Sequence, residues 1–502
     1  MVGMLTGASP IKGLIMSGLG LLFGSVGAAP ATAEERLSFG SIYLEDGIPL
    51  VIMGLAMFAI PEIIEVLRKR NTISNVAELG SGTMRGFAET LRHIGLVVRT
   101  SSLGVFVGAL PGLGGSVTNW VAYAHAMQSA KDRSQFGKGD IRGVIGPEAS
   151  NNADNGGALI PTLMFGIPGS ASMALFLGAL ILIGVEPGIG MMERHLDLTY
   201  IIIWSLALAN VIGAGICLFL AKPISRLTLV RFTLVAPFMI VIICFAAFQA
   251  TRSWDDLTTL FVLGVVGMYM KRFGWSRPAF LIGFVLAKQL DASVYQSIQV
   301  YGWTFLQRGG VQIILALTVV SIILALRMKP HRDPLSAEGP HAPLDRRPQF
   351  VFLGLLTLTV AYTIYDVWKL DFLAKVFPIS VAVVTLALLA VAAFQFTRNT
   401  PNYVFFDGER DWADNDKPNQ SELHYQIWIL GLLALIGLVG FILGIFFYIV
   451  TFLRLKANVK WQWAILGGLG AVLVLGTFGH VLALSYPRGL LQLMTDLPWP
   501  FD

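Results

Sequence analysis

Uncharged apolar runs of 18 or more residues recur along this chain, and each is long enough to cross a hydrocarbon layer of about 30 Å as a helix. Hydrophobic residues make up 55% of the 502 residues and charged residues only 13%, which is more apolar surface than one soluble core buries. Alternating strand patterns are absent from the sequence. These features predict an all-α, polytopic integral membrane protein built as a helical bundle.

The boundaries of the apolar runs place the expected membrane spans. We predict spans at 12–28, 46–67, 91–110, 116–129, 147–166, 171–186, 197–221, 232–250, 256–271, 276–290, 309–327, 349–366, 377–396, 427–453 and 461–485. The first run precedes Ala31-Thr-Ala33 and fits either a cleaved secretory signal or a retained helix. The formal net charge of +5 comes mostly from short loops, which is typical of cytoplasmic loops and not of a nucleic-acid surface.

Composition divides the chain into two membrane blocks. Residues 1–327 form the first predicted domain, 328–348 a polar, proline-rich linker, and 349–502 a second membrane domain. An acidic segment from Asp407 to Glu422 interrupts the second block. Its carboxylates have irregular spacing and match no calcium-binding pattern, so we interpret it as a solvated loop. The two cysteines, Cys217 and Cys244, lie in apolar runs and have neither disulfide nor metal spacing.

Two proline-glycine breaks interrupt the apolar pattern of the first block. One is Gly108-Ala-Leu-Pro-Gly-Leu-Gly-Gly-Ser-Val-Thr-Asn119, where a helix should end near Leu110 and Ser116 should cap the next helix. The other is Gly166-Ile-Pro-Gly-Ser-Ala-Ser172, where Ser170 or Ser172 should cap a new helix. The N-terminus of a helix offers unpaired N–H groups and the positive end of the helix dipole, which favours anion binding.

Between these breaks lies a polar stretch, Gly146-Pro-Glu-Ala-Ser-Asn-Asn-Ala-Asp-Asn-Gly-Gly157. We predict that a helix starts at Pro147, with Asn151 and Asn155 on one face. Amide side chains can bind carboxylates and hydroxyl groups, or a sodium ion through their carbonyl oxygens. Asp154 is a candidate for proton or sodium coupling, because a buried isolated carboxyl takes up a proton or a cation.

Two alternative interpretations compete with a substrate path. The glycines of membrane helices often permit close packing, and we favour that role for isolated glycines such as Gly156 and Gly157. The stretch from Gly146 to Asn155 could instead be an ordinary cytoplasmic loop. We favour a substrate or ion path, because three polar stretches fall within about 70 residues of an apolar chain.

At these residues the sequence resembles the large membrane subunit of the tripartite tricarboxylate transporters. The resemblance rests on Leu110-Pro-Gly-Leu-Gly114, on Pro147-Glu-Ala-Ser-Asn-Asn-Ala-Asp-Asn-Gly-Gly-Ala-Leu-Ile-Pro161, on Gly166-Ile-Pro-Gly-Ser170, on Leu177-Gly-Ala-Leu180 and on Glu186-Pro-Gly188. It covers residues 10 to 327. The block after the linker resembles the family's small four-helix membrane subunit, including Tyr486-Pro-Arg-Gly-Leu490.

The resemblance implies a secondary transporter of the bacterial inner membrane that takes up citrate or other di- and tricarboxylates by symport with protons or sodium ions. It also implies a periplasmic substrate-binding protein as partner, discontinuous helices, no cofactor and no catalytic or metal site. The candidate substrate-binding residues are Pro111, Gly112, Gly114, Gly115, Ser116, Asn151, Asn152, Asn155, Gly169, Ser170 and Ser172. The candidate ion-coupling residues are Asp154 and Glu148.

The chain departs from the family pattern in one respect. Family members carry an earlier half with its own break and polar segment, and this sequence resembles only the later half. A site normally built between two halves would then be half missing, and three explanations stay open: a truncated gene product, a split subunit, or pairing with another chain that supplies the missing half. Two other classes stay open: a truncated, non-transporting membrane scaffold, and an intramembrane enzyme, although no zinc-protease or nucleophile-elbow motif accompanies the carboxylates.

Overall fold

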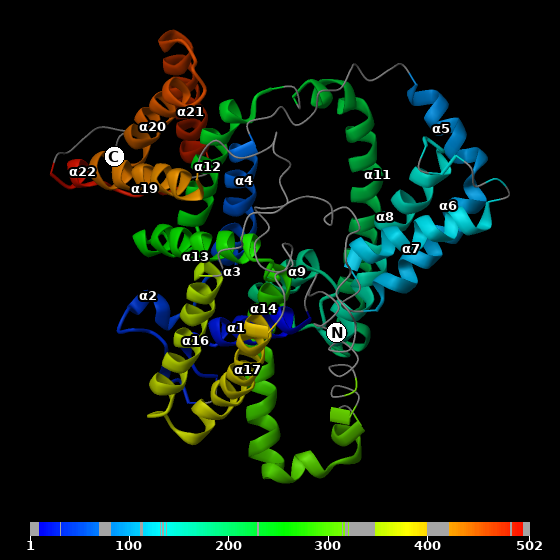
Figure 1. Cartoon of the computed structure of the whole chain (residues 1–502), viewed down its shortest axis with the longest axis vertical. Coiled ribbons are helices and arrows are strands. Elements are labelled where there is room, and N and C mark those ends of the chain that lie inside the picture. Colours follow the sequence, from blue (N-terminus) through cyan, green and yellow to red (C-terminus); the bar gives the residue numbers. More distant parts are fainter. Residues whose placement is uncertain are drawn as a thin grey trace. The chain divides into compact units, whose positions relative to one another are not determined.

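The structure is a computed structural model that describes residues 10–30, 32–69, 82–110, 114–130, 132, 135–136, 138–227, 230–313, 315–316, 320, 347–398, 421–481 and 484–494. The described residues are almost entirely helical, which confirms the predicted all-α class (Figure 1). Packing groups them into two compact units. Unit 1 draws on residues 1–37, 78–222 and 274–405, and unit 2 on residues 38–77, 223–273 and 406–502.

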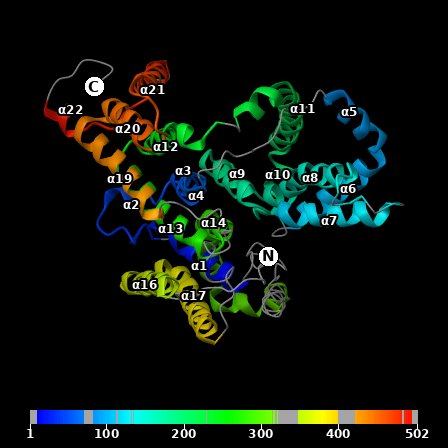
Figure 2. The ribbon, with the colours of Figure 1, turned by 45° about the horizontal axis from the view of Figure 1, so that its top comes forward.

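Unit 1 contains most of the helices around the predicted polar stretches. Its described elements are α1 (Pro10–Gly24), β1 (Gly27–Ala28), β2 (Glu35–Arg36), α5 (Thr83–Arg92), α6 (Ile94–Gly108), α7 (Gly114–Ser129), α8 (Arg142–Phe165), α9 (Ala171–Leu182), α10 (Gly190–Glu193), most of α11 (Leu196–Leu227), α14 (Arg277–Tyr301), the 3-10 helix η3 (Gly302–Gln307), α16 (Arg347–Val367) and α17 (Phe372–Arg398). The two strands pair antiparallel. Helices α6, α7 and α8 lie side by side (Figure 1, Figure 2).

Unit 2 combines helices from three separate parts of the sequence. Its described elements are α2 (Ile42–Glu45), α3 (Leu50–Gly54), the π-helical segment η2 (Leu55–Ala59), α4 (Ile60–Lys69), α12 (Phe232–Phe248), α13 (Trp254–Arg272), α19 (Glu422–Val439), α20 (Phe441–Leu455), α21 (Trp461–Val481) and α22 (Leu490–Met494). The stretch from α3 to α4 runs without interruption and forms one candidate span, Leu50–Arg68.

Among the described residues, six helices are long and apolar enough to cross a membrane. They are Leu50–Arg68, Leu196–Ala221, Arg347–Val367, Phe372–Thr397, Glu422–Val439 and Trp461–Val481, and shorter apolar helices accompany them. The protein is therefore a multi-pass membrane protein. Helix α8 is absent from this set because of its polar centre, although its 24 residues extend over about 36 Å.

The first apolar run forms α1, which packs inside unit 1 against α14 and α17. Gly20 faces the backbone of Phe280 on α14 so closely that an added Cβ would overlap the carbonyl oxygen of that residue. The ammonium of Lys12 lies 5.4 Å from the ring centroids of both Trp275 and Phe396. Whether this run is a cleaved signal or a retained helix stays open.

The predicted single span at 427–453 was wrong. Gly440, with φ +85°, separates α19 from α20, because this conformation ends a helix and is open mainly to glycine. The predicted span at 309–327 and the linker at 328–348 lie mostly outside the described residues. The two domains predicted from composition do not coincide with the two packed units, since α16 and α17 belong to unit 1 and α19 to α22 belong to unit 2. The division at residues 327 and 349 stays a prediction.

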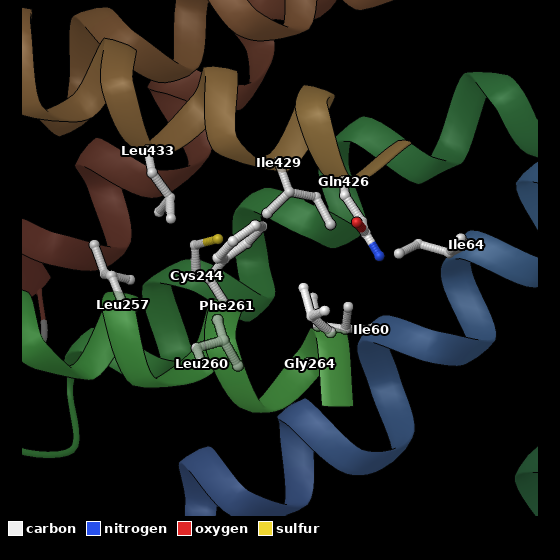
Figure 3. A pocket seen from close by; sticks show the side chains of 11 residues that line it. Ile60, Ile64, Cys244, Leu257, Leu260, Phe261, Gly264, Gln426, Ile429 and Leu433 are labelled. Atoms are coloured by element: carbon white, nitrogen blue, oxygen red, sulfur yellow. The ribbon is translucent and has the colours of Figure 1, made fainter. Parts of the chain in front are cut away.

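Unit 2 contains a small pocket between α4, α12, α13 and α19 (Figure 3). It encloses about 320 Å³ of empty space, including the part that opens outward. Its lining is apolar apart from Cys244 and Gln426, and Gln426 Nε2 lies 3.6 Å from the sulfur of Met268. None of the predicted site residues lines it, so we interpret this pocket as a packing gap between helices.

Candidate functional site

Helices α6 and α8 approach each other until their backbones touch. A Cβ added at Gly104 would overlap the carbonyl oxygen of Ser150, and one at Gly108 would overlap that of Asp154. From the other side, a Cβ at Gly157 would overlap the carbonyl oxygen of Val105. Small residues at such a contact are the usual means by which membrane helices pack closely. The packing role predicted for Gly157 is therefore confirmed, whereas the same prediction for Gly156 was wrong, because no described atom lies within 4 Å of a Cβ added there.

The contact with α6 determines which face of α8 is buried. Ser150 is 0% and Asp154 6% exposed, and both face the glycines of α6. Thr118 on α7 is also fully buried, and its Oγ1 donates a hydrogen bond of 2.9 Å to Asp154 Oδ1. Within the described part of the chain, no lysine, arginine or histidine forms an ion pair with Asp154. Asp154 is thus a buried carboxyl whose described partner is a neutral hydroxyl.

The asparagines of α8 lie on the opposite, exposed side. Asn151, Asn152 and Asn155 are exposed, together with Glu148 and Gly156. Asn155 Nδ2 donates a hydrogen bond of 3.3 Å to the carbonyl oxygen of Asn151, one turn earlier, which confirms that these two residues share a face. Gly156 has open space where a Cβ would stand. Helix α8 therefore presents a polar band outward and holds its one buried carboxyl inward.

The predicted start of α8 at Pro147 was wrong, because the helix begins at Arg142. The carboxylate of Asp140 accepts a hydrogen bond from the backbone N–H of Arg142 at 2.9 Å and from its guanidinium at 2.6 Å. These hydrogen bonds hold the pKa of Asp140 below its usual value. Pro147 lies inside the helix, where it lacks an N–H donor and its ring crowds the carbonyl group one turn earlier, and the helix nevertheless continues through it. The middle polar stretch is therefore neither a break nor a loop but continuous helix.

The second break has the predicted form. Helix α8 ends at Gly166, whose φ of +63° is the left-handed conformation that commonly ends helices. Helix α9 then starts at Ala171 with Ser170 as its N-cap, and Ser170 Oγ accepts a hydrogen bond of 3.2 Å from the N–H of Met173. Ser172 lies inside the first turn and is exposed, whereas Gly169 is buried.

The first break is described only at its edges. Helix α6 ends at Gly108, as predicted, and α7 starts at Gly114. Pro111 and Gly112 lie outside the described residues, and so do the surroundings of Gly114, Gly115 and the Ser116 side chain. The prediction that Ser116 caps this helix was wrong, because α7 already includes it in its first turn.

The two new helix N-termini do not meet at one point on α8. The first turns of α7 reach Asp154 through Thr118, whereas α9 starts beyond the C-terminal end of α8. Eleven residues separate Asp154 from Phe165, which corresponds to about 16 Å along the helix. The predicted residues therefore form three separate groups. The buried carboxyl and the exposed asparagines lie at the same height on different faces of α8, and the Ser170 cap follows beyond the C-terminal end of that helix.

Sequence reasoning missed several buried polar groups near Asp154. Thr118 Oγ1 bonds to Asp154, and the described structure leaves three nearby atoms of α7 and α8 buried without a hydrogen-bond partner: Asn119 Oδ1, His125 Nε2 and Ser150 Oγ. The sequence contained a signal for Ser150 only: it precedes Asp154 by four residues, one helical turn, and therefore lies on the same face of α8. Of these atoms, Ser150 Oγ lies on the same α6-facing side of α8 as the buried carboxyl of Asp154.

Glu422 departs from the interpretation of its segment as a solvated loop. It is 7% exposed, and its carboxylate accepts hydrogen bonds from Arg68 at 2.8 Å and from Arg272 at 3.2 Å. Both arginines belong to unit 2, on α4 and α13. The interpretation was therefore wrong for Glu422, which forms a buried ionic contact of unit 2. The rest of the acidic segment lies outside the described residues.

Two curated proteins are similar to this chain over part of its length. A 52.8 kDa uncharacterised protein of Agrobacterium vitis, from the TAR-I ttuC' 3' region, is 29% identical over 322 residues, covering 63% of this chain and 62% of the relative. An uncharacterised protein of the TAR-II ttuC' 3' region of the same organism is 28% identical over 240 residues, covering 47% of this chain and 99% of the relative. The chain thus spans less than two thirds of the first relative's length.

No solved structure matches the chain. Residues 1–282 match the sequence profile of one family, and this region contains α6 to α9 with both helix breaks and the polar band of α8. The match covers more than half of the 502 residues. The chain belongs to the tripartite tricarboxylate transporter TctA family.

Proposed function

We propose that this protein is the membrane component of a cation-gradient-driven secondary transporter that takes up di- and tricarboxylates or related organic acids. In this proposal it resides in a bacterial inner membrane and receives substrate from a periplasmic binding protein, as the family implies. No cofactor is needed, because a proton or sodium gradient supplies the driving force. Another chain supplies the half of the site that the sequence does not resemble.

The single observation that carries the proposal is the polar band of α8. Asn151, Asn152 and Asn155 are exposed, whereas Ser150, Asp154 and Gly157 of the same helix are buried against α6. Amide side chains on an exposed face are costly against lipid, so such a face normally borders a cavity, a water-filled path or another protein. Amides donate and accept hydrogen bonds, which fits the carboxylate and hydroxyl groups of organic acids.

Asp154 is proposed as the ion-coupling residue. It is buried and bonds to the hydroxyl of Thr118, so a charged state here calls for a compensating cation or a proton. It lies on the same helix as the amide band, one residue before Asn155. Binding at the band and cation uptake at Asp154 would then act on one rigid helix. Glu148 is exposed within the band, and we propose that it faces the same path.

Residues 349–502 are proposed to act as the family's small membrane subunit, fused to the large one. In unit 1, α16 and α17 pack beside α1, and in unit 2, α19 and α20 pack beside α4, α12 and α13. The Glu422 contact with Arg68 and Arg272 is one buried link of this kind. Such packing supports an integral role for the second block.

The test is uptake of radiolabelled citrate and succinate by proteoliposomes that contain the full chain, a candidate binding protein and a partner chain for the missing half. Imposed proton and sodium gradients identify the coupling ion. We expect Asn151→Ala and Asn155→Ala each to lower uptake about tenfold or more while insertion stays normal, because each removes polar contacts worth about 1–3 kcal/mol. Asp154→Asn should abolish the response to the gradient.

The matched control is Ile160→Ala, an exposed apolar position on the same helix, which should leave uptake unchanged. If the wild-type chain shows no uptake even with both partners present, the transporter proposal fails and a non-transporting scaffold is the better account. If Asn151→Ala removes folded protein and uptake in equal proportion, the amide band serves packing and not substrate.

A further inference from the structure

The carboxyl group of Asp154 lies where three helices of unit 1 meet. Helices α6, α7 and α8 pack against one another in pairs (Figure 2). A Cβ added to Gly108 on α6 would lie 2.9 Å from Asp154 Oδ1, and Thr118 Oγ1 on α7 lies 2.9 Å from the same oxygen. The carboxyl group is therefore held between the bare backbone of one helix and a hydroxyl group of another.

Thr118 uses its hydroxyl group differently from two other threonines of these helices. Thr100 on α6 and Thr162 on α8 are fully buried, and each donates a hydrogen bond to a carbonyl oxygen of its own helix, at 2.9 and 2.7 Å. Thr118 is buried to the same degree, but its hydroxyl group reaches a carboxyl group of another helix. The contact that Thr118 makes between α7 and α8 therefore depends on the charge of Asp154.

The charged groups of the surrounding helices do not compensate Asp154. Helices α6 and α7 face this residue, whereas α9 to α11 pack further along α8, from Ala158 onward. Besides Asp154, the titratable residues of α6, α7 and α8 are Arg99, Tyr123, His125, Arg142 and Glu148. Within the described part of the chain, none of them forms a hydrogen bond or an ion pair with Asp154. The hydroxyl group of Thr118 is the side-chain donor that the described residues offer to the ionised carboxylate.

This donor stabilises the two states of Asp154 unequally. A buried carboxylate is stable only when its charge is compensated, and a hydrogen bond to a charged acceptor is stronger than one to a neutral acceptor. In the cation-free state Thr118 donates to a negative charge. When a cation is bound, that charge is neutralised and the extra stabilisation is lost. The hydroxyl group therefore favours the cation-free state over the loaded state.

We propose that Thr118 is a positioning residue that lowers the affinity of Asp154 for the coupling cation, so that the cation is released after transport. This inference rests on the proposed function, because it takes Asp154 as the ion-coupling residue. If the cation is a proton, the O–H bond of the Asp154 carboxyl breaks, the proton leaves to water, and the electron pair stays on the carboxylate. If it is a sodium ion, its contacts with the carboxylate oxygens are exchanged for water. No bond of Thr118 breaks in either case.

The experiment measures initial rates of citrate uptake over a series of proton or sodium concentrations, in proteoliposomes that contain the full chain, the binding protein and the partner chain. Thr118→Val keeps the branched shape but lacks the hydroxyl group. We expect its half-maximal rate at about one tenth of the wild-type cation concentration. A tenfold change corresponds to about 1.4 kcal/mol, close to the contribution of a hydrogen bond to a charged group. Its maximal rate should fall, because release is slower.

Two further variants at the same position separate the hydroxyl group from the fold. Thr118→Ser keeps the hydroxyl group and should return the half-maximal cation concentration to the wild-type value. Thr118→Ala lacks the hydroxyl group and is smaller, so the comparison does not depend on the folding of one variant. A purely structural defect would lower the maximal rate without lowering the half-maximal cation concentration. Adding Thr118→Val to Asp154→Asn should cause no further change in uptake, because Thr118 acts only through the carboxyl group.

The matched control is Thr100→Val, the same substitution at a buried threonine whose hydroxyl group bonds within its own helix. Its half-maximal cation concentration should equal that of wild type. A wild-type or higher half-maximal concentration in both Thr118→Val and Thr118→Ala, or an equal decrease in Thr100→Val, would overturn the inference and leave the transporter proposal standing. If the wild-type chain takes up no citrate under any gradient, both proposals fail, since Thr118 then has no cation release to assist.

Discussion

Two adjacent glycines of α8 provide a sharp test of which face of this helix is packed. At Gly157 an added Cβ would overlap the carbonyl oxygen of Val105 on α6, whereas at Gly156 it would meet nothing within 4 Å. The substitutions Gly156→Ala and Gly157→Ala are chemically identical and differ by one residue in position. We expect the first to raise the free energy of unfolding and the second to lower it.

The magnitude follows from two opposing effects. Alanine in place of glycine in a helix stabilises by about 0.5–1 kcal/mol, and this gain is common to both variants. Only Gly157→Ala adds a methyl group where a backbone oxygen already stands, and such overpacking costs about 1–3 kcal/mol. The difference between the two variants is therefore the overpacking cost itself. Unit 1 is larger than the domains of about 150–250 residues in which each kcal/mol shifts the unfolding midpoint by about 2–4 °C, so the shift here should be about 1–2 °C per kcal/mol.

The assay is thermal unfolding of the two purified full-length variants in the same detergent, followed by tryptophan fluorescence. The expected order of midpoints is Gly156→Ala above wild type and Gly157→Ala below it. Equal midpoints for the two variants would refute the close approach of α6 and α8. The inward position of Asp154 would then lose its structural basis, because the same contact buries it.

Three further changes test local features. Ser170→Ala removes the cap of α9 and should lower the unfolding free energy by about 1 kcal/mol, whereas Ser172→Ala should not, as measured by thermal unfolding. Asp140→Asn should lower the unfolding midpoint at neutral pH. The lowered pKa of Asp140 means that its ionised form stabilises the fold, and this contribution is complete only above the pKa of about 3.9 that an aspartate has in the unfolded chain. The difference in midpoint between the variant and wild type should therefore disappear as the pH falls through the pKa of Asp140 in the folded protein. Glu422→Gln removes the carboxylate charge that Arg68 and Arg272 share and should lower the free energy of unfolding by about 3–5 kcal/mol, with a midpoint unchanged from wild type as the contradicting result.

The helix breaks were predictable because their causes are local. Gly166 ends α8 in a conformation that glycine permits, and Ser170 caps α9 through its own hydroxyl. Both signals lie within a few residues of the boundary. The start of α8 was less visible, because Pro147 is tolerated inside the helix and the stabilising contact comes from Asp140, seven residues earlier.

The separation of Asp154 from the asparagines could not be derived from spacing alone. In a helix Asp154 lies only about 60° from Asn151, so the sequence groups them together. Which of them turns inward depends on Gly104 and Gly108, more than 40 residues away on α6. Glu422 shows the same limit, since its burial depends on two arginines that are distant in sequence. Contacts with other helices decide which side of a helix is buried, and the spacing of residues along that one helix carries no information about those contacts.

The central claim is that the asparagines in the polar band of α8 contact the organic acid. The chain has only two cysteines, so Cys217→Ser with Cys244→Ser gives a background in which one cysteine at a time can be placed on α8. The measurement is the rate at which a maleimide labels Asn155→Cys in proteoliposomes, with and without saturating citrate. Citrate should slow labelling at this position and leave labelling of Ile160→Cys unchanged. Equal rates with and without citrate at Asn155→Cys, in vesicles that take up citrate, would contradict the claim.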